Sequence, residues 1–422
     1  MSQVLGTEDL QAPTDHALES VPGIITTLRH REFRIFITGA FLSNLGTWTQ
    51  AVALSWLILQ LTNSAFLVAL VPAAQFGPIL ILGIPGGVLV DRFDRKRLLL
   101  WSQVVMAITA AVLAIITYLD AVTAAIAIPL VAVGGSAMAI HAPAFHALMS
   151  DMLPRRNVRA AIAINSSQFS MSRVIGPAVG GYIVAFKGAG LAFALNAVSF
   201  IFVIGALLMI HITPHEKSSR IRRSSFTRAF KVTSSSPQLQ TLLSVAIALS
   251  LVSAPIVALL PVMARDVLNG GADLYGHLFG AFGLGTAIGS LSSHRAVSRI
   301  GYRRLVIFGG AAQGILLIGF AISTTIALNL VLIGVYGLFH GATLAANLGA
   351  VQLAVPNRSR GRVMSLFMVA FAGLFPVGSL ISGGIAEKIG AVNALVGTGA
   401  LTILVSLVGL MFASQLNSIK SD

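Results

Sequence analysis

The residues best suited to chemistry are charged side chains next to or within long apolar runs. Asp91 and Arg92 begin the segment DRFDRKR, and Asp151 ends a second apolar run. Carboxylates and guanidinium groups so placed can form charge-assisted hydrogen bonds that hold helices together. Arg173 is different because it lies in the middle of an apolar run, where a charge costs at least about 2.5 kcal/mol. It is therefore expected to face a cavity or a partner.

Uncharged polar residues and histidines recur on the same apolar runs. On a helix they share faces at spacings of three and four, and histidine can titrate near neutral pH. Such residues more often bond to a neighbouring helix than to a ligand, and each bond is worth only about 0.6 to 2 kcal/mol. The candidate cavity residues are Asn44, Thr47, Gln50, Gln75, His141, Arg173, His340 and Asn347.

The composition shows which solvent these runs face. Hydrophobic residues make up 56% of 422 positions and charged residues only 10%, whereas about a quarter of a soluble domain is charged. Apolar runs of about 20 residues, enough for a spanning helix, recur along the chain. We therefore predict an all-α membrane protein. The sequence has no cysteine, phosphate-binding loop or metal-ligand constellation, so no ATP-driven pump, metal site or cofactor is expected.

Polar breaks divide the apolar runs into twelve predicted transmembrane helices, arranged as two halves of six. The predicted helices cover residues 33–61, 65–90, 97–118, 122–150, 160–186, 190–212, 239–265, 273–297, 303–323, 326–352, 361–385 and 390–413. The predicted domains are a tail (1–32), a six-helix bundle (33–212), a basic linker (213–238), a second six-helix bundle (239–413) and a tail (414–422).

Lysine and arginine are distributed unevenly over the loops. Alternate loops and the linker are rich in both, whereas the loops between them hold only Lys187, Arg265 and Lys388. Because basic residues favour cytoplasmic loops, we predict a multi-pass protein of the plasma (inner) membrane with both termini in the cytoplasm. This topology also accounts for the net charge of +14, so nucleic-acid binding is not expected.

The two halves repeat each other at matching places. VDRFDRKR from Val90 corresponds to VSRIGYRR from Val297, and LPRRNVRAA from Leu153 corresponds to VPNRSRGRV from Val355. Parallel six-helix repeats related by an axis along the membrane normal describe the major facilitator architecture, with a substrate path between the halves. We therefore expect two pseudo-symmetric halves.

Specific motifs resemble the major facilitator superfamily. GGVLVDRFDRKR, over 86–97, resembles its signature loop, although Ser298 replaces the acid in the second copy. SRVIGPAVGG, over 172–181, resembles the helix 5 motif of export members. Together with phrases in predicted helices 1 and 4, these motifs resemble the branch that includes the enterobactin exporter and macrolide efflux proteins. An Asp is frequent in that branch where Thr47 stands here, so the role of that carboxylate is not transferred.

The resemblance assigns roles to two groups of residues. It implies that Asp91 faces the start of predicted helix 11 and that Gly87 lets helices approach; the implied gating motif is Gly87, Asp91, Arg92, Arg95, Arg97, Asp151, Gly361 and Arg362. The matching helix 5 positions are Arg173, Gly176, Pro177, Gly180 and Gly181. For the glycines a gating or packing role is expected. Arg173 is left open between binding a substrate anion, pairing with a carboxylate and snorkelling.

The resemblance implies a secondary active transporter that exports a small amphiphilic molecule, such as a drug, natural product or siderophore. It implies alternating access, exchange for protons and a monomer in the lipid bilayer. The candidate proton carriers are Asp151, His141 and Asp91, because no acid lies in the central third of any predicted helix. An importer of a small metabolite is the main alternative, and a membrane-embedded enzyme or a sensor is more remote.

Overall fold

The computed structural model describes residues 23–210, 233–355 and 360–411. Within these ranges every regular element is helical. Most of the predicted tails and linker lies outside the described residues, so the predicted domain boundaries stay predictions.

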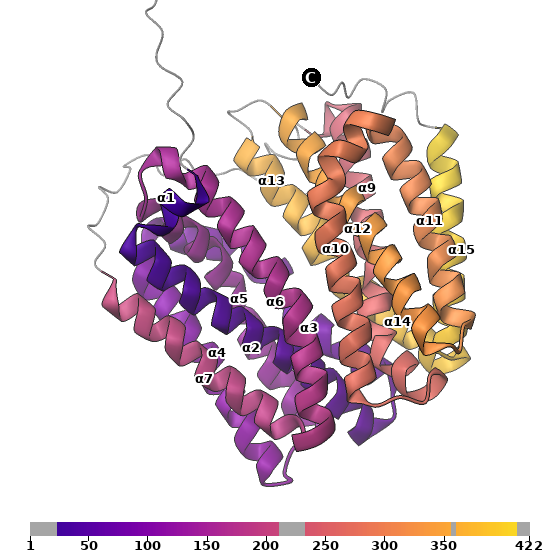
Figure 1. Ribbon diagram of the computed structural model, residues 1–422, viewed down its shortest axis with the longest axis horizontal. Helices are drawn as coiled ribbons and strands as arrows, with labels where there is room; N and C mark the ends of the chain where they lie inside the picture. Colours follow the sequence, from indigo (N-terminus) through magenta and orange to yellow (C-terminus); the bar gives the residue numbers. More distant parts are fainter. Residues whose placement is uncertain (1–22, 211–232, 356–359, 412–422) are drawn as a thin grey trace, which may run out of the picture.

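Six long helices form the first bundle, shown in indigo to magenta in Figure 1. Their bounds differ from the predicted ones by only a few residues. They are α2 (Arg31–Thr62), α3 (Ala65–Arg92), α4 (Arg95–Tyr118), α5 (Ala124–Asp151), α6 (Val158–Lys187) and α7 (Ala189–Met209), with the short helices α1 (Ile24–Leu28) and η1 (Arg155–Asn157).

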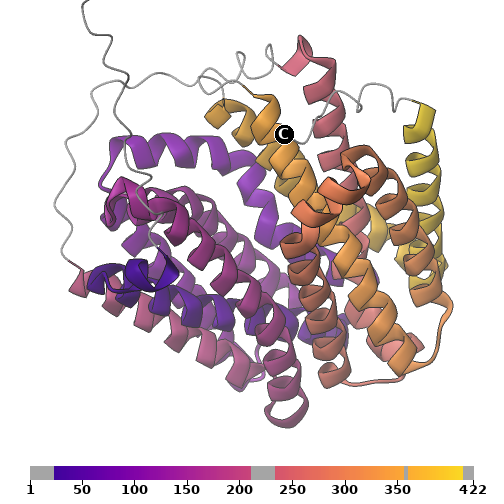
Figure 2. The same cartoon turned by 45° about the horizontal axis from the view of Figure 1, so that its top comes forward.

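The second bundle, in orange to yellow, lies beside the first in both views (Figures 1 and 2). Its elements are α9 (Pro237–Val262), η2 (Met263–Val267), α10 (Ala272–Ile300), α11 (Tyr302–Ile322), α12 (Ile326–Ala354), α13 (Arg360–Met368), η3 (Val369–Gly373), α14 (Phe375–Ile389) and α15 (Ala391–Met411). The predicted helix over 361–385 is thus divided, because the π-helical turn η3 separates α13 from α14. Single π turns within helices are frequent at functional sites.

Ten stretches of the described chain are long and apolar enough to cross a membrane. Helices α2 and α10 are not among them, although they contain 32 and 29 residues. Both pack against α6, where glycine and polar residues replace aliphatic ones. The chain is therefore an all-α, multi-pass membrane protein, while the count of twelve crossings stays a prediction.

The buried apolar residues show how the bundles meet. We call the end with the α3–α4 and α5–α6 connections the basic end, and the other the opposite end. Toward the opposite end, one hydrophobic cluster contains residues of both bundles, such as Trp56 and Tyr275. Toward the basic end there are two separate clusters, one in each bundle. The ribbons likewise diverge toward the basic end, at the top of Figure 1.

Candidate functional site

Helices α6 and α10, from different bundles, meet through glycines. A Cβ added at Gly181 would lie 2.8 Å from the Cα of Gly276, and one at Gly276 would lie 2.9 Å from the Cα of Gly181. Farther toward the basic end, a Cβ at Gly283 would lie 2.8 Å from the carbonyl oxygen of Arg173. Real Cβ atoms do not approach other atoms this closely, so any side chain here would push the bundles apart.

The other glycines of the helix 5 motif pack within the first bundle. A Cβ at Gly176 would lie 2.6 Å from the Cβ of Trp48, and one at Gly180 would lie 2.7 Å from the carbonyl oxygen of Thr49. The Thr49 hydroxyl also donates a hydrogen bond of 3.1 Å to the carbonyl of Gly176. Gly176 and Gly180 of the motif therefore pack α6 against α2. Gly181 and the buried Pro177 pack it against α10.

Arg173 lies eight residues before Gly181 on α6, about two turns toward the basic end. Its guanidinium carbon lies 5.6 Å from the ring centroid of Trp48 and 5.2 Å from that of Phe282. Its Nε is buried and has no hydrogen-bond partner among the described residues. The cation is thus held between aromatic rings of α2 and α10, which belong to different bundles.

His340 on α12 lies on the other side of Phe282. The ring centroids of His340 and Phe282 are 6.0 Å apart, and His340 stacks on Tyr336 with a centroid distance of 6.2 Å and an interplanar angle of 10°. The side chain is only 2% exposed, yet Nδ1 has no partner among the described residues. We call Trp48, Arg173, Phe282 and His340 the Arg173 cluster.

The predicted polar residues of α2 make hydrogen bonds inside the first bundle. Asn44 Nδ2 donates to Gln168 Oε1 of α6 at 3.2 Å. Gln50 Oε1 accepts a hydrogen bond from Asn196 Nδ2 of α7 at 2.8 Å. The Thr47 hydroxyl donates to the carbonyl of Ser43 on its own helix at 2.8 Å. Asn44 and Gln50 therefore join helices in this conformation.

The remaining predicted cavity residues occupy different environments. Asn347 is fully buried; its Oδ1 accepts a hydrogen bond of 2.6 Å from the Tyr302 hydroxyl, and its Nδ2 donates to the Leu242 carbonyl at 3.1 Å. His141 Nδ1 lies 3.2 Å from Gln103 Nε2, and Gln75 is half-buried on α3. Of the predicted cavity residues, only Arg173 and His340 come together in one cluster.

At the basic end, the described gating residues Arg95 and Asp151 contact each other within the first bundle. Arg95 Nη1 lies 2.7 Å from both carboxylate oxygens of Asp151, which joins α4 to α5. A Cβ at Gly87 would meet no atom within 4 Å. Arg92 and Arg97 are exposed. The side chains of Asp91 and Arg362 and the environment of Gly361 lie outside the described part of the chain, so the predicted contact between them is untested.

At the opposite end, polar side chains join the bundles. Glu387 Oε2 of α14 accepts hydrogen bonds of 3.1 Å from the Ser64 hydroxyl and the Phe66 amide, at the start of α3. Arg265 of η2 donates to the Leu59 carbonyl at 3.2 Å and to Asn63 Oδ1 at 2.8 Å.

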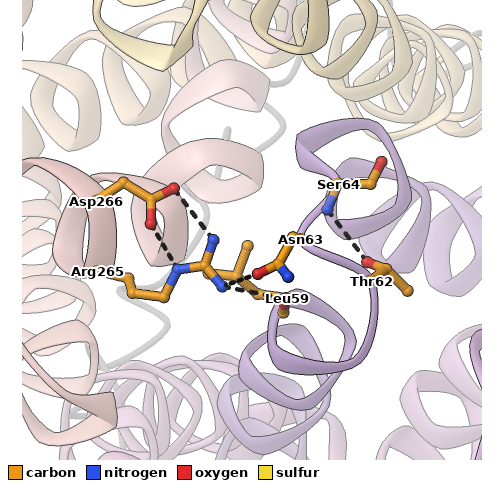
Figure 3. A network of polar contacts seen from close by, with 6 residues as sticks. All are labelled: Leu59, Thr62, Asn63, Ser64, Arg265 and Asp266. Atoms are coloured by element: carbon orange, nitrogen blue, oxygen red, sulfur yellow. Dashed lines mark hydrogen bonds and ion pairs between the residues drawn. The ribbon is translucent and has the colours of Figure 1, made fainter.

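Asp266 completes this arrangement by pairing with Arg265 (Figure 3). These contacts border a cavity of about 450 Å³ lined by residues of both bundles. The loop charges place Arg265 at this end, but the sequence indicates no role for Arg265, Asp266 or Glu387. We call Arg265, Asp266 and Glu387 with their partners the opposite-end latch.

Several known proteins resemble the chain over almost its whole length. It is 25% identical over 382 residues to the staphyloferrin A transporter of Staphylococcus aureus, covering 89% of this chain and 94% of that protein. It is 25% identical to the multidrug efflux pump Tap of Mycolicibacterium fortuitum over 384 residues, with coverages of 87% and 92%. It is 24% identical to the enterobactin exporter EntS of Shigella flexneri over 395 residues, with coverages of 93% and 94%.

A solved structure has the same fold. The crystal structure of a bacterial homologue of the human lysosomal transporter Spinster, in an inward-facing and occupied conformation, matches with a TM-score of 0.73 and 15% identity, covering 93% of this chain and 98% of that chain. The family model described as transmembrane secretion effector matches residues 23–422. With its two helical bundles and the helix 5 glycines at their junction, the chain belongs to the transmembrane secretion effector family of major facilitator transporters and is not an enzyme.

Proposed function

We propose that the chain exports a small amphiphilic molecule, such as a drug, a natural product or a siderophore, by alternating access. The Arg173 cluster is the observation that carries this proposal. It combines a cation with aromatic rings and brings together side chains of both bundles. Such a combination suits a molecule with both a polar and an apolar part.

The proposed direction of transport rests on the charges of the loops and on the family. Basic residues favour the cytoplasmic side, so we assign the basic end and both termini to the cytoplasm, in the plasma (inner) membrane of a bacterium. The ends of the two bundles that have separate apolar clusters then face the cytoplasm, where an exporter takes up its substrate. Two of the relatives are a multidrug efflux pump and an enterobactin exporter, which supports export.

Exchange for protons and a monomeric state belong to the same proposal. Asp151, which pairs with Arg95, is the first candidate proton carrier. His141, hydrogen-bonded to Gln103, and Asp91 are the others.

Inside-out membrane vesicles test the proposal. An exporter is expected to accumulate dye in the vesicle lumen when the lumen is acidified, and a protonophore should abolish this accumulation. The probes are three amphiphilic dyes of different charge, namely fluorescein, rhodamine 6G and Nile red. Vesicles without the protein are the control. Accumulation only in right-side-out vesicles would identify an importer and contradict the proposal.

A further inference from the structure

Arg173 has no acidic partner at its depth in the bundle. It is near the middle of α6, which runs from Val158 to Lys187. In the described helices, by contrast, every Asp and Glu lies within three residues of a helix end. A charged group in the membrane interior is costly unless it faces a cavity or a partner. Among the described residues, no acid lies where it could neutralise this cation.

The aromatic rings beside Arg173 satisfy only part of its bonding capacity. A guanidinium group carries five N–H donors in its plane, whereas Trp48 and Phe282 offer their π systems at 5.6 and 5.2 Å. Among the described residues, Nε of Arg173 is buried without a partner, and so is Nδ1 of His340, whose ring lies next to Phe282. Two buried polar groups from different bundles thus lack partners at one place, and buried polar groups normally have them.

Two serines lie on the same helix face as Arg173, toward the basic end. Ser166 is exposed and Ser170 is half-buried on α6, and both lie on the same face of the helix as Arg173, at spacings of seven and three residues. Glycine contacts close the other side of the cluster, where Gly181 meets Gly276. These tight contacts block the cluster toward the opposite end, so a ligand would have to reach it from the basic end.

We propose that the Arg173 cluster binds the anionic group of the substrate, a carboxylate or a similar oxyanion attached to an aromatic or apolar body. Arginine binds carboxylates through two parallel hydrogen bonds, and the rings of Trp48 and Phe282 contact the apolar body. This inference rests on the proposed function and narrows its substrate class: amphiphilic anions are preferred over cations and neutral molecules.

Binding measurements on the full chain in lipid nanodiscs test this inference. The probes are salicylate and salicylamide, which share a ring but carry a carboxylate and a neutral amide, respectively. Trp56→Phe and Trp101→Phe leave Trp48 as the only tryptophan of the three in the sequence, so its fluorescence reports the cluster. Salicylate is expected to bind saturably and about tenfold or more tightly than salicylamide.

Variants separate an anion site from a structural arginine. R173Q should weaken salicylate binding about tenfold or more and leave salicylamide binding unchanged, whereas R173K, which keeps the charge, should retain an intermediate affinity. The control K187Q removes a positive charge from the exposed end of the same helix and should change nothing. Thermal melting checks that each variant folds. If R173Q does not fold, the affinity of R173K for salicylate and the comparison of the two probes decide whether Arg173 forms an anion site.

The site is disproved if salicylate does not bind saturably, if salicylamide binds equally well, or if R173Q or its substitute R173K binds salicylate like the parent protein. These outcomes differ from failure of the proposed function because binding is measured without transport. If salicylate binding depends on Arg173 but inside-out vesicles accumulate no dye, export is wrong and the anion site stands.

Discussion

The two ends of the transporter are held together by different kinds of contact. At the opposite end, glycine contacts, a shared apolar cluster and the latch all join one bundle to the other. At the basic end, the described polar contacts of Arg95 and Lys96 stay within the first bundle, to Asp151 and to the Ile210 carbonyl. Contacts at the opposite end must therefore break if the bundles rock, whereas those at the basic end can persist.

This difference indicates which contacts set the balance between conformations. Rocking of one bundle against the other around a central site is the usual motion of such folds. Substitutions at the opposite end should destabilise the conformation described, and substitutions that block closure of the basic end should stabilise it. Because the sequence has no cysteine, a single introduced cysteine reports one position in labelling experiments.

The largest effect is expected from G181V. The valine side chain would collide with the backbone of Ala272 and Gly276, and overpacking of this kind costs about 3 kcal/mol, or about a 100-fold change in population. Labelling of a cysteine at Val262, which is 6% exposed at the latch cavity, should rise strongly. G205V is the control because a Cβ at Gly205 would meet nothing within 4 Å. Unchanged labelling in G181V would show that this junction does not hold the bundles.

The second largest effect is expected from G87V, which should favour the conformation described, whereas G181V should disfavour it. The valine side chain fits the conformation described because a Cβ at Gly87 has open space around it. If the basic end closes on Gly87, the substitution should lower dye transport about tenfold, which corresponds to about 1.4 kcal/mol. The melting temperature should stay unchanged, and labelling of a cysteine at the exposed Ser167 should increase. Normal transport by G87V would contradict closure at this glycine.

Breaking the Arg95–Asp151 pair should have a moderate effect on both conformations. The two side chains are 38% and 18% exposed, so D151N should cost about 1 kcal/mol of stability. The exchange R95D/D151R should restore part of the lost stability, which thermal melting can measure.

The same variant tests proton coupling. If D151N abolishes the proton dependence of dye transport while transport down a dye gradient continues, Asp151 carries the proton. Retained proton dependence would leave His141 and Asp91 as candidates.

The smallest effect is expected from E387Q. A carboxylate at a helix N-terminus contributes about 0.3 to 1 kcal/mol, so labelling at Val262→Cys should rise about two- to fivefold. D120N is a matched control, since Asp120 is exposed at the same end between α4 and α5. Equal increases in E387Q and D120N would point to a general charge effect at this end and not to the latch.

Much of the fold could be predicted because hydropathy and loop charge report directly on the bilayer. The helix bounds and the helix 5 glycines needed no knowledge of partners. The roles of polar residues depend on partners that the sequence does not show. Gln50, Asn347, Arg173 and His340 are all polar residues within apolar runs. In the described part of the chain, Gln50 and Asn347 have hydrogen-bond partners, whereas Arg173 and His340 each keep an unpaired nitrogen. Periodicity identifies the face of a helix, but it does not identify what lies against that face.

The latch could not be found from the sequence for a related reason. Glu387 and the Phe66 amide are separated by 321 positions, and no pattern along the chain connects them. The π turn η3 also left no clear signal, although Pro376 follows it closely. Such features arise from how separate helices meet in space.

The glycine junction between α6 and α10 has a mechanical consequence. Bare backbones at Gly181 and Gly276 can roll over each other, since no side chains interlock there. The junction then acts as a fulcrum placed off-centre, close to the opposite end. A lever with unequal arms magnifies movement on its longer side, so a small separation at the latch would produce a wide swing of the helix ends at the basic end.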